Sequence, residues 1–218
     1  MAIAEPATTL TDYALAILGF ALGARLLGRE SLASRRLFGA SLVATGSAAL
    51  TGGTSHGFAP HLSPEASAAL WIATYTAIGV ASLLILAGAA AAAFSPAGRS
   101  WAMSLLVVRL VAYLCAVLPD RQFRFVVHDY ALTLAALLAF AVHGWLTRSQ
   151  PGAPWIAAGV LVSAGGAAIQ YARLAPHPHF NHNDLFHVLQ AVGVYLFYVG
   201  ALGLGDHRRG GTGTSGGA

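Results

Sequence analysis

The sequence predicts an all-α fold, a polytopic membrane protein built as a bundle of seven transmembrane helices. Two observations carry this prediction. First, 56% of the 218 residues are hydrophobic and only 9% are charged, whereas roughly a quarter of the residues in a soluble globular domain are charged. Second, the apolar residues form seven runs, each close to the length of roughly 20 residues that a helix needs to cross a bilayer.

Short connections that contain proline, glycine, serine or charged residues separate the seven runs. The runs are Leu10–Leu27, Leu37–Phe58, Ala66–Phe94, Trp101–Leu118, Phe123–Leu146, Pro154–Leu174 and Asn183–Leu204. Because helices joined by tight connections pack against one another, we expect one domain over residues 1–209. Residues 210–218 are glycine, serine and threonine with one alanine, which predicts a disordered tail.

The arginines predict how the bundle is oriented. Eight lie near one set of helix ends: Arg25, Arg29, Arg35, Arg36, Arg99, Arg148, Arg208 and Arg209. Three lie near the other set, namely Arg121, Arg124 and Arg173. By the positive-inside rule, the amino terminus lies outside and the carboxyl terminus lies in the cytoplasm. Arginine-only basic usage with abundant alanine and glycine favours the inner membrane of a bacterium.

Composition also excludes several classes of function. The chain has no lysine, so it cannot be a retinal-type photoreceptor or any enzyme that needs a lysine Schiff base. Its one cysteine, Cys115, cannot form an internal disulfide. The arginines sit at membrane edges, where topology already explains them, so we expect the lipid bilayer and no nucleic acid as a partner.

Polar side chains gather at the start of the seventh run, between Phe180 and Gln190. Asp184 and His187 are three residues apart and therefore share a face of a helix. By the predicted topology, His56 ends the second run at a similar depth. Ionisable groups at membrane depth are costly and normally face the interior of a bundle or a water-filled cavity. This end of the bundle is therefore the predicted functional site.

The residue types at this site match a catalytic zinc centre, in which two imidazoles and a carboxylate leave one position for water. His56, Asp184 and His187 are the candidate zinc ligands. Glu65 or Asp129 is the candidate for taking the proton from the zinc-bound water or for orienting a ligand imidazole.

Three other interpretations stay open. Asn181 and Asp184 have the spacing of a helix capping box, which by itself explains the acid. Asp129 has the right charge to neutralise Arg109, the one arginine inside the fourth run, because buried ions pair. His56 and His187 could together ligate a haem, which needs two facing imidazoles.

Four motifs resemble a family of uncharacterised bacterial seven-helix membrane proteins. They are Leu10-Thr11-Asp12-Tyr13 after Glu5-Pro6, Gly52 to Phe58, Phe180 to His187, and Tyr195 to Tyr198. This resemblance covers nearly the whole chain but implies no activity.

The layout more distantly resembles the CREST superfamily, which includes alkaline ceramidases and the progestin and adiponectin receptors. That resemblance implies a membrane hydrolase in which His56 and His187 match two of the histidines of the family's metal site and Glu65 stands for its aspartate. Two positions depart from the pattern: Gly52 occupies the place of a serine and Asn183 that of a histidine. Because asparagine is a poor zinc ligand, the three-histidine site cannot be carried over intact.

Taken together, these patterns favour a zinc-dependent membrane hydrolase that acts on an amide or ester of a lipid-like substrate near the outer face. The alternative is a non-enzymatic seven-helix sensor or binding protein whose outer polar pocket accepts a small ligand.

Overall fold

Seven α-helices and one short 3-10 helix make up the fold in the computed structural model, which describes residues 3–177 and 180–207. The helices are α1 (Pro6–Arg29), α2 (Ala33–Phe58), η1 (Ala59–His61), α3 (Pro64–Ala93), α4 (Pro96–Asp120), α5 (Phe123–Leu146), α6 (Ala153–Tyr171) and α7 (His182–Leu202). Each apolar run of the sequence corresponds to one α-helix. The predicted tail, residues 210–218, lies outside the described residues.

Six of these helices are long and apolar enough to cross a membrane, and α2 is the exception. Its lower hydropathy comes from many serine, threonine and glycine residues. Most of its hydroxyl groups donate to the carbonyl oxygen four residues earlier, as Thr45 does to Ser41 and Ser55 does to Thr51. Helix α2 also packs against α1, α3 and α7. Most of its hydroxyl groups are therefore satisfied within the helix, and neighbouring helices cover it.

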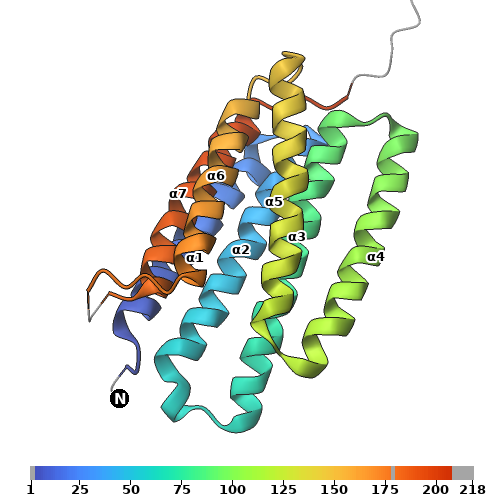
Figure 1. Cartoon of the computed structure of the whole chain (residues 1–218). Helices are drawn as coiled ribbons and strands as arrows, with labels where there is room; N and C mark the ends of the chain where they lie inside the picture. The colour runs from blue at the N-terminus through green and yellow to red at the C-terminus, as the bar shows by residue number, and fades with distance from the viewer. Residues whose placement is uncertain (1–2, 178–179, 208–218) are drawn as a thin grey trace, which may run out of the picture.

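Helix α4 stands at one edge of the bundle, whereas α1, α2, α6 and α7 gather on the other side (Figure 1). The main core lies among those four helices with α3 and α5, and its fully buried side chains include Phe38, Leu137 and Ile156. A smaller cluster around Tyr75 and Tyr113 joins α3, α4 and α5. The site described below lies in the more densely packed part of the molecule.

Glycines let α1 and α2 approach closely. Gly39, Gly46 and Gly53 are seven residues apart along α2, and all three lie against α1. A Cβ atom on Gly46 would lie 2.9 Å from the carbonyl oxygen of Ala16, and one on Gly53 would lie 2.6 Å from the Cβ of Asp12. Small residues permit such close contacts between membrane helices. The contact at Gly53 fixes the backbone that carries Asp12.

The segment after α7 fastens the opposite end of the bundle. The carboxylate of Asp206 accepts hydrogen bonds from the backbone N–H groups of Ala33 (2.9 Å) and Ser34 (2.8 Å) and so caps the start of α2. Partial burial raises the pKa of Asp206, but the hydrogen bonds from Ser34 and Ala33 and the charge of Arg99 outweigh it and hold this pKa below its ordinary value. The capping carboxylate therefore stays ionised at neutral pH.

Substituting Gly53→Ala should destabilise the protein by about 1–3 kcal/mol, because the added methyl group overlaps the Cβ of Asp12 and forces α1 away from α2. Gly165→Ala is the matched control, since a Cβ there meets no atom within 4 Å. Unfolding free energies of both variants in the same detergent provide the measurement. Equal stabilities would contradict the role given to this contact.

Candidate functional site

A capping box starts α7, as the spacing of Asn181 and Asp184 indicated. The Asn181 Oδ1 atom accepts from the backbone N–H groups of Asn183 (2.7 Å) and Asp184 (3.4 Å). In return, Asp184 Oδ2 accepts from the N–H of Asn181 at 2.6 Å. Both interactions satisfy N–H groups that would otherwise lack partners at a helix start.

Asp184 also ties α7 to α1. It is fully buried, and its Oδ1 atom accepts a 2.7 Å hydrogen bond from the hydroxyl of Thr8, which is itself 1% exposed. Both carboxylate oxygens of Asp184 therefore have donors, and the helix start adds favourable positive potential. This carboxylate holds the first turns of α1 and α7 in register.

One turn further along both helices, His187 lies between two side chains of α1. Its Nδ1 atom is 3.2 Å from the hydroxyl of Thr11, and its Nε2 atom is 3.3 Å from Oδ1 of Asp12. The imidazole is largely buried, with 11% of its side chain exposed. Thr11, His187 and Asp12 thus form a continuous chain of hydroxyl, imidazole and carboxylate.

Two proton arrangements fit this chain. In the first, Nε2–H of His187 faces the ionised Asp12, and Nδ1 accepts from Thr11. In the second, Thr11 donates to its own helix, where the carbonyl oxygens of Ala7 and Thr8 both lie at 3.0 Å, and Nδ1–H donates to Thr11. The second requires a protonated Asp12 or a charged imidazole. The second arrangement therefore holds one proton more than the first.

Asp12 differs from Asp184 in its partners. It is 4% exposed, and its Oδ2 atom is buried without a hydrogen-bond partner. The two carboxylates are close enough to interact electrostatically. A buried carboxylate with an unsatisfied oxygen is costly, and such groups occur more often at functional sites than elsewhere.

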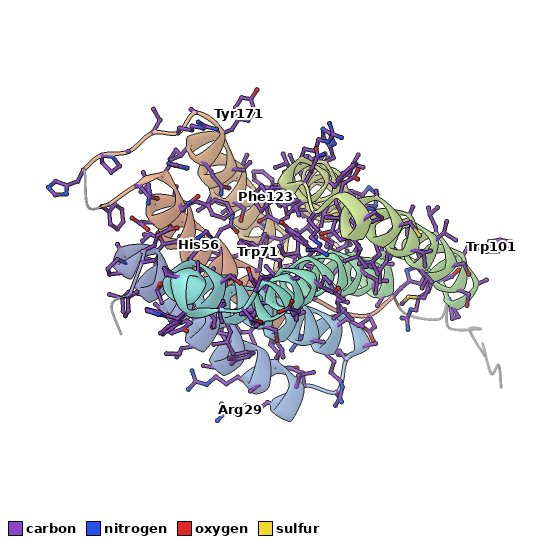
Figure 2. All side chains as sticks on the ribbon, turned by 90° about the horizontal axis from the view of Figure 1, so that it is seen from below. Arg29, His56, Trp71, Trp101, Phe123 and Tyr171 are labelled. Carbon is purple, nitrogen blue, oxygen red and sulfur yellow. The ribbon has the colours of Figure 1, made fainter. Side chains whose placement is uncertain are left out.

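His56, the candidate zinc ligand on α2, has a different partner. Its Nδ1 atom is 3.3 Å from Oε1 of Glu5, and its ring makes an edge contact with Trp71, with the ring centres 5.5 Å apart. Figure 2 shows the two rings beside each other. His56 and His187 lie at the same end of the bundle and are close enough to interact electrostatically, but each is held by its own carboxylate.

The two candidate bases lie on other helices. Glu65 is exposed in the first turn of α3. Asp129, on α5, is buried and accepts a 2.7 Å hydrogen bond from Arg109 of α4, which also reaches the hydroxyl of Thr133 at 2.6 Å. The interpretation that Asp129 pairs with Arg109 is thus confirmed. This ion pair links α4 to α5.

Among the described residues, no group of three or more histidine, cysteine, aspartate or glutamate side chains is placed to hold a metal ion. The capping and interhelical bonds already occupy both oxygens of Asp184. A zinc site at His56, Asp184 and His187 would need these side chains to leave their present partners. The zinc site stays a prediction.

A groove of about 450 Å³ opens beside the chain of Thr11, His187 and Asp12. Its walls come from α1 and α7, and apart from Thr11 and His187 its lining is almost entirely apolar. The lining residues are Thr11, Ala14, Leu18, His187, Val188, Ala191, Val192 and Tyr195. Several of them are exposed, so the groove is open along the side of the bundle.

A larger cavity of about 650 Å³ lies at the opposite end, beneath the segment after α7. Much of its polar lining is committed to the fold: Gln150 bonds Ala92 and Gly205, Arg35 bonds Leu204, and Asp206 caps α2. The α1–α7 site is therefore the better candidate for function.

Thr8, Thr11 and Asp12 are absent from the candidates predicted from sequence, although Thr11 and Asp12 belong to one of the quoted motifs. Their spacing could have identified them. Thr11 and Asp12 follow Thr8 by three and four residues, so all three share one face of α1. The next stretch of α1, residues 14–24, has no polar side chain.

The chain belongs to a family of unknown function, DUF6962, which it matches over residues 7–206. This covers the whole helical bundle and nearly all the motifs quoted above. No curated protein and no solved structure matches the chain. The resemblance to the CREST superfamily therefore stays a prediction.

The Thr8–Asp184 contact can be tested by a double-mutant cycle. Thr8→Val removes a donor from a buried carboxylate, and Asp184→Asn places an amide where two donors now point. Each change should cost about 1–3 kcal/mol. Because they remove the same contact, the double variant should cost less than the sum by at least about 0.5 kcal/mol.

Unfolding free energies of the four proteins give the coupling. Thr45→Val is the control, since its hydroxyl donates to Ser41 within α2. Additive effects of Thr8→Val and Asp184→Asn would contradict the role of this bond in joining α1 to α7.

Proposed function

We propose that this is a multi-pass membrane protein that binds an amphiphilic small molecule between α1 and α7. The observation that carries the proposal is that Thr11 and His187 belong to a polar hydrogen-bonded chain and also line an apolar groove. A ligand with one apolar chain and one polar group matches these two surfaces. Ligand pockets typically pair an apolar lining with a few such polar groups.

The size of the groove supports an alkyl chain as occupant. From Thr11 to Leu18 the groove follows α1 for about 10 Å, at roughly 1.5 Å per residue. Its volume of about 450 Å³ lies in the range of small-molecule sites, roughly 300–1,000 Å³. Because it opens sideways, a chain can enter from the lipid.

The proposal includes the orientation derived from the arginines, with the α1–α7 site near the outer face of a bacterial inner membrane. A reporter that is active only in the cytoplasm should be active when fused after Gly205 and inactive when inserted near Pro60. Both fusions must be detected in the membrane fraction. The reverse pattern would overturn the orientation.

Photolabelling tests the binding proposal. Dodecanol with a diazirine on its chain should label α1 and α7 at the groove, and excess unlabelled dodecanol should suppress this labelling. Ala191→Trp fills the groove and should abolish it. Val108→Trp is the matched control, because Val108 is exposed on α4 away from the groove.

Labelling that is spread over the exposed helix faces and is not reduced by dodecanol would reject the binding site. Equal labelling of the Ala191→Trp and Val108→Trp proteins would do the same. Peptide mapping by mass spectrometry distinguishes these patterns.

The zinc-dependent hydrolase predicted from the sequence is the second candidate. The proximity of His56, Asp184 and His187 at one end of the bundle favours it. It requires about one zinc ion per chain in protein purified without chelator, and loss of zinc in His187→Ala. Elemental analysis of folded, monodisperse protein supplied with zinc decides this candidate.

A further inference from the structure

We propose that Thr11 is a nucleophile, that His187 is its general base and that Asp12 orients the imidazole, so that the groove hydrolyses an ester of an aliphatic acid. This inference rests on the proposed function, because the ester must first bind in the α1–α7 groove. It adds a reaction and assigns each residue a role.

The geometry is that of an activated nucleophile. A hydroxyl group lies within hydrogen-bond reach of a base, and the base is held by a third group. Here the Thr11 hydroxyl is 3.2 Å from Nδ1 of His187, and Nε2 of the same ring is 3.3 Å from Asp12. Such constellations are recognised by their geometry and not by the order of their residues in the chain.

Other threonines show why Thr11 stands out. Thr45 and Thr51 of α2 donate to carbonyl oxygens of their own helix, as threonines in apolar helices commonly do. Thr11 has the same local acceptors, but it also faces an imidazole and lines an open groove. The residue is half-buried, and its side chain lines the groove.

The two aspartates divide their roles. Asp184 accepts from Thr8 and from the backbone of Asn181, so both of its oxygens serve the packing of the helices. The Oδ1 atom of Asp12 lies 3.3 Å from Nε2 of His187, and a proton on Nε2 leaves Nδ1 free to accept a proton from Thr11. Asp12 touches no ligand and therefore acts as a positioning residue.

The reaction balances without a cofactor. The Thr11 oxygen attacks the ester carbonyl while Nδ1 of His187 takes its proton. The bond to the leaving alcohol then breaks, and the alcohol receives that proton, leaving an acyl ester on Thr11. Water attacks the acyl ester, His187 takes a proton from this water and returns it to Thr11, and a carboxylic acid is released.

The test uses the full chain in detergent with p-nitrophenyl octanoate as the substrate. Wild-type protein should release p-nitrophenol. Thr11→Val and His187→Gln should each lower kcat by roughly a hundredfold or more, and Thr11→Ser should retain turnover. Asp12→Asn should lower kcat more than it changes KM, because it misplaces the base and leaves the groove intact.

A covalent readout identifies the nucleophile. An alkyl fluorophosphonate should add once per chain, and peptide mapping should place the adduct on Thr11 in wild-type protein and on the new side chain in Thr11→Ser. An adduct on another residue would overturn the assignment. So would turnover that survives in Thr11→Val, or turnover that is lost when chelator removes zinc.

Dodecanol photolabelling separates this inference from the binding proposal. Asp12→Asn leaves the groove intact and touches no ligand, so this variant should still be labelled while its kcat falls. Wild-type protein that is labelled in the groove but shows neither turnover nor adduct would overturn the catalytic inference and leave the binding proposal standing. Wild-type protein that is not labelled in the groove would overturn both.

Discussion

The buried carboxylate of Asp184 is the constraint on which the site depends. It completes the capping box that starts α7 and accepts the hydroxyl hydrogen of Thr8 from α1. Burying a charge is unfavourable unless hydrogen bonds compensate. Asp184 therefore favours a packing of α1 against α7 that keeps its hydrogen bonds from the Thr8 hydroxyl and the Asn181 N–H. One turn along each helix, the same register places His187 against Asp12. The local cap of one helix thus determines which residues of another helix reach the imidazole.

Three other ion pairs join ionisable groups of the described residues. Arg109 of α4 reaches Asp129 of α5, Arg35 reaches Glu30, and His56 reaches Glu5. Asp12 and His187 form such a pair too. Asp12 has a buried unsatisfied oxygen, as Asp129 does, and such burial is costly. The Asp12–His187 pair differs because it also lies beside the groove between α1 and α7. Both functional proposals therefore concern this pair.

Helix positions were predictable because apolar runs of this length have few alternatives, and every predicted run corresponds to one helix. The ends were less predictable: α4 begins at Pro96, five residues before the predicted run, because Ser95 caps it with proline at its first position. At the site, the predicted depth in the membrane grouped His56, Asp184 and His187 together. Depth alone does not determine which side chains of other helices contact them. Glu5 holds His56, and Thr8 holds Asp184. These contacts join residues far apart in the chain.

By itself, the sequence determined the all-helical class, the number of helices and the capping box at Asn181 and Asp184, because hydropathy and capping depend on residues close together in the chain. Only the tertiary structure decided that Asp12, and not Glu65 or Asp129, meets His187. That pairing depends on how far α1 slides and turns against α2 and α7. The close contact at Gly53 and the bond from Thr8 to Asp184 fix this geometry, and the pattern of either helix alone contains neither.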